Sequence, residues 1–374
     1  MMTEHNHTLT DTERLDWLRL YRSENVGPVT FFRLLEQFGG AGRALQALPD
    51  LARRGGGKAL RLCPKAEAER ELAALHKLGA RLLCAAEPEF PAALRAAETA
   101  PLLTVRGHLH LLRRPMVAVV GGRNASVAGQ RLAENLARDL GQGGMVVASG
   151  MARGIDSAAH RGALASGTVA VLAGGVDVIY PPENRPLYER LVAEGAVLSE
   201  MPPGTQPQAA HFPRRNRLIS GLAAGLVVVE ASLKSGSLIT ARLALEQGRE
   251  IFAVPGSPLD PRSLGGNSLI KQGAVLVETA ADILAPLQDL LRQPLRDPAG
   301  RGSGAAPPPS DGAGLDQARL RLRQALSPTP VALDDLVRGE GLAPGVLSLL
   351  LLELDLAGRL ERHPGNRVSL LPER

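Results

Sequence analysis

The chain has 374 residues, of which 44% are hydrophobic and 22% charged, which is enough to form packed cores in two or three domains. No apolar run approaches the ~18 residues of a membrane helix. The polar N-terminal segment also lacks the basic and then apolar regions of a signal peptide, so we expect a soluble, cytoplasmic protein with no membrane contact. Cys63 and Cys84 are the only cysteines, which excludes a disulfide framework and a cysteine-cluster metal site.

The formal net charge is +5, and an excess of positive charge favours an anionic partner such as nucleic acid. Lysine supplies only five of the 43 basic residues, so part of the arginine excess also fits the composition bias of a GC-rich genome. The positions of the arginines therefore matter more than their number.

Residues 1–14 are predicted to be a disordered tail and residues 15–110 an N-terminal helical domain, with leucines at helical spacing up to about residue 85. The run Asn25-Val26-Gly27-Pro28 interrupts this pattern. A turn between two helices resembles a SAM-like or helix-hairpin-helix module, although a single Gly-Pro pair also ends an ordinary helix.

From residue 111 to residue 290 short apolar runs alternate with helical stretches. The expected strands are 116–120, 145–148, 169–172, 196–198, 226–230, 251–254 and 275–277, and the expected helices are 126–140, 154–166, 185–194 and 237–247. Strands that are apolar on both faces and alternate with helices predict an α/β domain, with an extended Rossmann-like, doubly wound and mostly parallel sheet.

Residues 291–314 are predicted to be a flexible linker, because 16 of the 21 residues from 294 to 314 are Pro, Gly, Ala or Ser. Residues 315–374 contain three helical patterns and a short hairpin, which predicts a winged-helix domain. The helix expected at 344–356 is apolar almost all round and holds no Lys or Arg. We therefore expect this helix to be buried or to contact protein rather than to enter a DNA groove.

The first strand of the 111–290 domain ends in a glycine-containing turn, Gly121-Gly122-Arg123-Asn124-Ala125-Ser126. Glycines let the backbone approach a phosphate, and Ser126 can cap the following helix. Arg123 adds a guanidinium with several N–H donors, so the turn predicts an anion site. An ordinary tight turn is the alternative. A GxGxxG fingerprint, a ribose-binding acid after the second strand and a GxxxxGK[ST] loop are all missing, so no nucleotide cofactor is expected.

The second strand leads into a similar turn, Ser149 to Gly154, which again contains one arginine, Arg153. Asp156, Ser157 and His160 follow and suggest a hydrolase. However, neighbours on one helix cannot form a nucleophile–base–orienter relay. We expect Asp156 to be a helix cap, and His160 to be structural or a phosphate donor.

The segment His211-Phe212-Pro213-Arg214-Arg215-Asn216-Arg217 has three arginines in four positions beside an aromatic residue. This pattern suits backbone phosphates and one stacked base, with a solvated charge run as the alternative. A third capped turn follows the fifth strand at Ser235-Gly236-Ser237. Glu230, at the end of that strand, is either a structural carboxylate or the general base of an enzyme.

These loops follow the carboxyl ends of parallel strands, where an open α/β sheet binds its ligands. The predicted nucleic-acid-binding residues are Gly121, Gly122, Arg123, Ser126, Ser149, Gly150, Arg153, Gly154, Asn184, Phe212, Arg214, Arg215, Asn216, Arg217, Ser235 and Gly236. No catalytic or metal-binding residue is predicted. Only ten aromatic residues occur in the chain, so we expect arginines and backbone amides to bind the strand with little sequence preference.

Six segments, in this order, resemble the DNA-processing protein A family, also called DprA or Smf: GGRNAS, SGMARGIDSAAH, VLAGGVDVIYPPEN, FPRRNRLISGL, EASLKSGSLITARLALEQGRE and VPG. The resemblance covers about 115–285. The GSR-type loop of the family corresponds to Gly121-Gly122-Arg123, where Gly122 replaces the serine. Arg153 matches a position that is often basic, and the FPxRNR segment matches 212–217.

The resemblance implies a non-enzymatic homodimer that binds single-stranded DNA and loads RecA onto it during natural transformation, against competition from single-strand-binding protein. Two other hypotheses stay open. One is a Rossmann-like nucleotide-binding or nucleotide-hydrolysing enzyme that uses Glu230 and Arg123. The other is a scaffold that binds RecA but not DNA.

Overall fold

The computed structural model describes residues 8–57, 60–292, 312–363 and 365–371, and the chain divides into two compact units. One unit joins residues 10–68 to the C-terminal region, and the other comprises residues 69–294. Residues 1–7 of the expected tail and 293–311 of the expected linker lie outside the described residues. Among the described residues, no helix is both long and apolar enough to cross a membrane.

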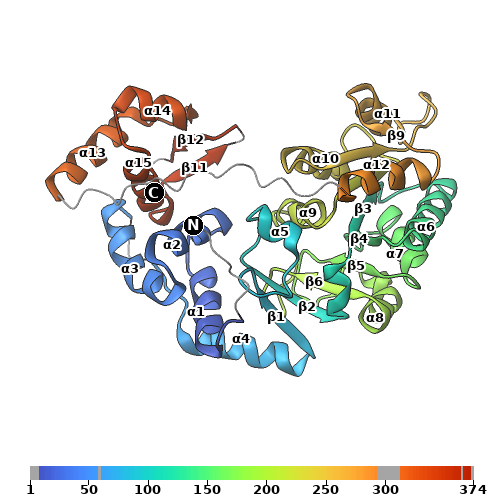
Figure 1. Ribbon diagram of the computed structural model, residues 1–374, viewed down its shortest axis with the longest axis horizontal. Coiled ribbons are helices and arrows are strands. Elements are labelled where there is room, and N and C mark those ends of the chain that lie inside the picture. The colour runs from blue at the N-terminus through green and yellow to red at the C-terminus, as the bar shows by residue number, and fades with distance from the viewer. Residues whose placement is uncertain (1–7, 58–59, 293–311, 364, 372–374) are drawn as a thin grey trace. The chain divides into compact units, whose positions relative to one another are not determined.

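The larger unit is built on a nine-stranded sheet with the order β1-β2-β6-β5-β4-β3-β7-β8-β9. Figure 1 shows this sheet with β1 to β6 labelled. The strands are β1 (Ala80–Cys84), β2 (Leu102–Gly107), β3 (Met116–Gly121), β4 (Val146–Ser149), β5 (Thr168–Val171), β6 (Ala196–Ser199), β7 (Gly225–Val229), β8 (Glu250–Ala253) and β9 (Val275–Leu276). Strands β3 to β9 are parallel, which confirms the doubly wound, mostly parallel sheet.

Helices cover both faces of this sheet. They are α5 (Ala92–Ala96), α6 (Val127–Gln142), α7 (Ile155–Ala163), α8 (Arg185–Glu194), α9 (His211–Leu222), α10 (Gly236–Glu246), α11 (Leu264–Lys271) and α12 (Ala281–Arg292). Alternate residues of β3, β4 and β7 form one core with α6, α7 and α12, whereas α9 and α10 lie on the opposite side (Figure 1). Because both faces are buried, these strands are almost entirely apolar.

The strand order reverses at β3. The chain adds β4, β5 and β6 on one side of β3 and then returns to add β7, β8 and β9 on the other side. In the register between β3 and β7, Val119 pairs with Val227 and Gly121 with Val229. The loops after β3 and β7 therefore diverge at a topological switch point, which is where open α/β sheets bind ligands.

Two strands lie inside the range 15–110 that was expected to be one helical domain. β1 and β2 pair with each other and, through β2, with β6 of the large sheet, all in antiparallel fashion. This part of the prediction is corrected, because both short strands belong to the larger unit. The prediction of a tail to residue 14 is also corrected. The first helix begins at Asp11 with a capping box between Thr10 and Glu13.

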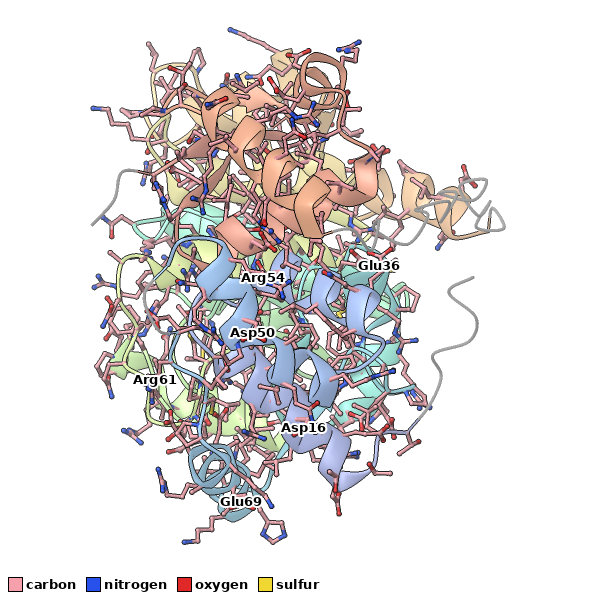
Figure 2. The ribbon with its side chains drawn as sticks, turned by 90° about the vertical axis from the view of Figure 1, so that its left-hand side faces the viewer. Asp16, Glu36, Asp50, Arg54, Arg61 and Glu69 are labelled. Atoms are coloured by element: carbon pink, nitrogen blue, oxygen red, sulfur yellow. The ribbon has the colours of Figure 1, made fainter. Side chains whose placement is uncertain are left out.

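The smaller unit contains the N-terminal helices α1 (Asp11–Arg22), α2 (Pro28–Phe38) and α3 (Ala41–Arg54) and the start of α4 (Lys65–Lys77). The ring of Phe31 makes edge-to-face contacts with Trp17 and Tyr21, at centroid distances of 5.1 and 5.8 Å, and these rings fix the packing of α1 on α2. Charged side chains such as Glu36, Asp50 and Arg54 lie on the outside of these helices (Figure 2).

The C-terminal region of this unit is a winged helix with α13 (Gly312–Ala325), α14 (Leu333–Glu340), α15 (Pro344–Leu356) and a small sheet of β10 (Val331–Ala332), β11 (Leu360–His363) and β12 (Arg367–Leu370). One side of α15 packs into the domain's own core, and the helix also contacts α2 and α3. Its buried Glu353 accepts two hydrogen bonds from Arg319, of 2.7 and 2.8 Å. These contacts agree with the expectation that α15 is buried and does not enter a DNA groove.

Candidate nucleic-acid interface

A groove of about 450 Å³ opens at the switch point. Its walls come from the loop after β3, from one side of α9, and from the loop after β7 together with the start of α10. A smaller pocket adjoins it over the loops after β4 and β5. Arg123, Ala152, Phe212 and Arg215 line both the groove and the pocket, so these residues lie where the two meet.

Arg123 is the exposed cation at this junction. Its guanidinium carbon lies 5.1 Å from the centre of the Phe212 ring, and the Phe212 ring lies 5.8 Å from the ring of Tyr180. A cation held over an aromatic face is oriented without being neutralised. The guanidinium therefore remains able to bind an anion, and the two rings beside it offer a surface for a flat apolar group.

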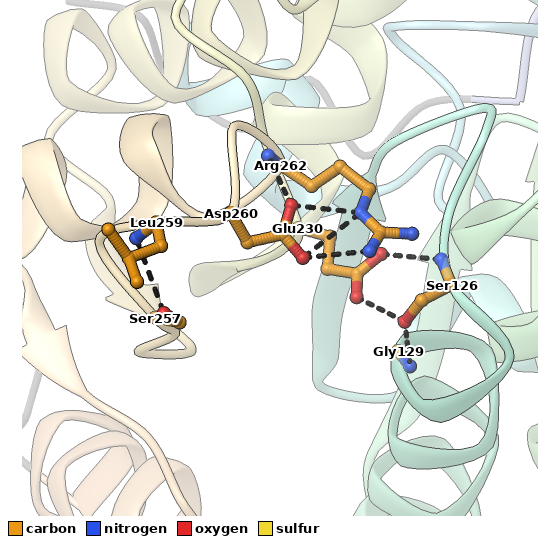
Figure 3. A network of polar contacts seen from close by, with 7 residues as sticks. All are labelled: Ser126, Gly129, Glu230, Ser257, Leu259, Asp260 and Arg262. Atoms are coloured by element: carbon orange, nitrogen blue, oxygen red, sulfur yellow. Dashed lines mark hydrogen bonds and ion pairs between the residues drawn. The ribbon is translucent and has the colours of Figure 1, made fainter.

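Ser126 caps α6 as expected, because its hydroxyl accepts a hydrogen bond of 2.9 Å from the backbone N–H of Gly129. The anion at this helix start, however, comes from the chain itself. The Ser126 backbone N–H donates to Oε2 of Glu230 at 2.7 Å, and the Ser126 hydroxyl donates to Oε1 of the same carboxylate (Figure 3). The structure therefore uses Ser126 internally, and it supports the structural interpretation of Glu230.

The turn after β4 is packed tightly against the turn after β3. Ser149 is fully buried and donates to the carbonyl of Val119 at 2.7 Å. Gly154 has a φ of +76°, and a Cβ there would lie 2.3 Å from the carbonyl oxygen of Gly122. Glycine is required here for its backbone conformation and for the close approach, so Ser149 and Gly154 shape the loops and do not line the groove.

Arg153 lies at the rim of the smaller pocket. Its side chain is 62% exposed and forms a 3.4 Å ion pair with Glu183, which is also largely exposed. Ion pairs of this kind are weak and exchange readily, so Arg153 is available to a competing phosphate. Asn184, in contrast, donates to the carbonyl of Met151 and to the hydroxyl of Ser157, at 2.8 and 2.9 Å, and joins two loops internally.

The basic segment 211–217 is the start of α9, a helix that the sequence did not predict. Successive helical residues point about 100° apart, so the three arginines face different surroundings. Arg214 is exposed, Arg215 is 7% exposed, and Arg217 donates to Glu200 and to the carbonyl of Thr99. The expectation that all three arginines contact phosphates is corrected for Arg217, which is held in an internal ion pair.

Arg215 forms the floor of both the groove and the pocket. One of its terminal nitrogens donates to the carbonyls of Gly150 and Val171, at 2.5 and 2.6 Å. Burial lowers the pKa of Arg215 to about 10, the Asp156 carboxylate opposes this change, and Arg123 adds a smaller lowering. Arg215 therefore stays charged at neutral pH, and it ties together the ends of β4 and β5.

Asp156 and His160 are both buried, although Asp156 also lines the groove. Burial raises the pKa of Asp156 against the opposing charge of Arg215, and its carboxylate accepts a hydrogen bond from the backbone N–H of Ala152 at 3.2 Å. The N-cap of α7 is Gly154, so Asp156 supports the turn and does not cap the helix. His160 is fully buried against Thr168, with 2.7 Å between Nδ1 and the hydroxyl oxygen, and is structural.

The far end of the groove is polar. Ser235 caps α10 and bonds to Ser237, and the exposed Gly236 adjoins it. Arg262 also lines this end, with its guanidinium held by Asp260 at 2.8 to 3.2 Å (Figure 3). Sequence reasoning missed Arg262, because the loop after β8 has neither a basic cluster nor a capped helix start that would single it out.

The predicted residues therefore separate into two groups. Those that line the groove or the pocket are Gly121, Gly122, Arg123, Gly150, Arg153, Phe212, Arg215, Asn216, Ser235 and Gly236. Those that line neither are Ser126, Ser149, Gly154, Asn184, Arg214 and Arg217. Two lining residues that were not predicted, Asn124 and Tyr180, lie in loops that follow parallel strands, and this position alone was a usable signal.

Family models match nearly the whole described chain. Residues 81–288 match a model described as DNA recombination-mediator protein A, residues 11–74 match the DprA-like N-terminal HHH domain, and residues 306–366 match the DprA winged helix domain. The protein Smf of Escherichia coli K12 is 41% identical over 311 residues, which is 82% of each chain. The DNA processing protein DprA of Streptococcus pneumoniae is 47% identical over 189 residues, 50% of this chain and 67% of its own.

Two of the solved structures to which the chain is similar are structures of DprA. The X-ray structure of DprA from Streptococcus pneumoniae covers 75% of this chain and 98% of its own, with a TM-score of 0.61 and 36% identity. A structure of DprA from Helicobacter pylori, whose subject is its single-stranded DNA binding mode, covers 56% of this chain and 96% of its own, with a TM-score of 0.51 and 30% identity.

Proposed function

The chain belongs to the DNA recombination-mediator protein A family, DprA or Smf, and we propose that its switch-point groove binds single-stranded DNA without catalysis. One observation carries the proposal: Arg123 is an exposed guanidinium over the Phe212 ring, at the junction of the groove and the pocket. The structural neighbour from Helicobacter pylori, described by its single-stranded DNA binding mode, supports it.

The chemistry of the groove and the adjoining pocket suits a flexible strand better than a duplex. Arg123 and Arg153 supply donors for phosphates, while Phe212 and Tyr180 offer rings to an unstacked base, and a duplex keeps its bases stacked. Contacts to phosphate do not depend on the identity of the base. Binding should therefore be nearly independent of sequence and should weaken steeply with salt.

We further propose the role that the family resemblance implies. The protein acts in the cytoplasm as a homodimer, displaces single-strand-binding protein and loads RecA onto single strands during natural transformation. The enzyme hypothesis receives no support from a specific contact, because both oxygens of Glu230 are engaged by Ser126, and a general base would first have to break these bonds.

A fluorescence anisotropy titration with single-stranded and duplex oligonucleotides of equal length tests the binding proposal. We expect at least about tenfold tighter binding to the single strand, from the phosphate and stacking contacts together. Equal affinity for both forms would contradict the proposal. RecA filament assembly on strands coated with single-strand-binding protein tests the loading step, which should accelerate when the protein is added.

A further inference from the structure

Glu230 places a carboxylate at the N-terminus of α6, the position at which Rossmann-like folds receive a phosphate. We propose that this carboxylate is a built-in anion that keeps free phosphate and mononucleotides out of the switch point. The groove then accepts only an anion that can be held further out, at Arg123. This inference concerns selectivity and does not depend on whether the groove binds single-stranded DNA.

The hydrogen bonds show that the donors at this position are already in use. The Ser126 backbone N–H and hydroxyl each donate to one oxygen of Glu230. The Ser126 oxygen in turn accepts the backbone N–H of Gly129 at 2.9 Å. Figure 3 shows Glu230 reaching from the end of β7 to this first turn of α6. A phosphate would need the same donors.

The space at this position is filled as well. A Cβ on Gly129 would lie 2.5 Å from the carboxyl carbon of Glu230 and 2.6 and 2.8 Å from its two oxygens. The carboxylate therefore lies directly against the first turn of α6, in the volume that a phosphate group would take. Because Glu230 also lines the groove, a ligand in the groove would meet this negative charge.

The backbone at Glu230 indicates that the side chain is retained for its carboxylate. Its φ is +48°, a left-handed conformation that favours glycine or asparagine and is strained for other residues. A residue that only ended β7 and turned the chain would be better as glycine. The two charge-assisted hydrogen bonds to Ser126 offset this strain.

The test is to remove the carboxylate and ask whether phosphate takes its place. Glu230→Gly removes the side chain and leaves a residue that suits the backbone conformation. Glu230→Gln keeps the volume but removes the charge. Glu246→Gln, on the exposed side of α10 beside Arg242, is the matched control, because it makes the same change in net charge away from the groove.

The midpoint of thermal unfolding is measured in inorganic phosphate and in chloride at equal ionic strength, after circular dichroism has confirmed folding. We expect phosphate to raise the Tm of Glu230→Gly by about 2–4 °C more than that of the parent protein, with a smaller excess for Glu230→Gln. The parent protein and Glu246→Gln should show only the same general stabilisation that phosphate, as a kosmotropic anion, gives relative to chloride.

The proposal is overturned if phosphate stabilises folded Glu230→Gly no more than it stabilises the parent protein, or if Glu246→Gln shows the same excess over the parent as Glu230→Gly. Should Glu230→Gly fail to fold, a phosphate effect in Glu230→Gln no larger than that in the parent protein overturns it. A loss of the proposed DNA function would not imitate either result, because the readout contains no DNA. The two proposals can therefore fail separately.

Discussion

The three arginines of α9 show how adjacent residues of one helix take different roles. Arg214 is exposed, Arg215 is buried against the carbonyls of Gly150 and Val171, and Arg217 pairs with Glu200. The guanidinium of Arg215 lies 2.3 Å from where a Cβ on Gly150 would be. Residue type alone therefore could not separate a surface cation from a structural one.

Replacement of Arg215 by alanine should destabilise the protein strongly. Asp156 would remain buried without its opposing charge, and two buried carbonyls would lose their donor, so the free energy of unfolding should fall by about 3–5 kcal/mol. The matched change Arg214→Ala should alter it by less than about 0.5 kcal/mol. Urea denaturation followed by circular dichroism measures both, and similar values for the two variants would show that Arg215 is not part of a buried network.

His160 should make the stability of the protein depend on pH. Burial lowers its pKa to about 3 from 6.5, with smaller contributions from Arg215 and Arg161. Below pH ~6.5 the unfolded chain binds a proton that folded His160 does not. The contribution of His160 to the free energy of unfolding is therefore fully present above pH ~6.5. It should fall by about 1.4 kcal/mol per pH unit as the pH decreases from there toward 3.

Asp156 acts in the opposite sense, because its raised pKa lets the folded carboxyl bind a proton at a higher pH than the unfolded one. The variant His160→Asn separates the two groups, since its amide can bond Thr168 but does not titrate. Between pH ~4.5 and 6.5 the fall of the urea midpoint with decreasing pH should be lost in the variant, which keeps only the opposing contribution of Asp156. Equal slopes would refute the assignment to His160.

At the scale of secondary-structure elements, the contact between α15 and the end of α3 links the N-terminal helices to the winged helix. A Cβ on Gly55 would lie 2.0 Å from the carbonyl oxygen of Glu353 and 2.8 Å from the side chain of Ala357. This approach brings the chain after α3 against the backbone of α15. α15 is apolar on nearly all sides because one side packs into the core of the winged helix and another packs against α2 and α3.

The variant Gly55→Ala should loosen this contact at a cost of about 1–3 kcal/mol, because the added methyl group has no space. Hydrogen exchange should show lower protection in both α3 and α15. Gly339→Ala is the control, since a Cβ there meets nothing within 4 Å. Unchanged protection in Gly55→Ala would mean that the two helices do not depend on each other.

The strands of the parallel sheet were predictable from the sequence within about two residues at each end, because each is a short apolar run between turn residues. Helix α9 was not, since buried Arg215 breaks its apolar pattern and Pro213 suggests a loop, although proline is tolerated in the first turn of a helix. β2 was missed because its partner β6 is about 90 residues further along the chain, and β1 because it joins the sheet only through β2. Local periodicity contains no information about such pairing.

At the scale of the whole molecule, all the groove-lining residues belong to the unit of residues 69–294. The sequence predicted the edge of the sheet where the groove opens, because that edge follows from strand order and loop position. It did not predict which loop residues point inward. Ser126 and Glu230 satisfy each other, a pairing of residues 104 positions apart, and only the fold brings them together.

The central claim, that Arg123 binds the phosphates of a single strand in this groove, is tested by measuring single-stranded DNA affinity over a range of salt concentrations. Arg131→Ala on α6 is the control, because Arg131 is exposed in the same unit and does not line the groove. Arg123→Ala should bind about tenfold more weakly, with the slope of log K against log salt reduced by about 0.7, and Arg131→Ala should match the parent protein. An Arg123→Ala variant with the affinity and slope of the parent protein would contradict the account.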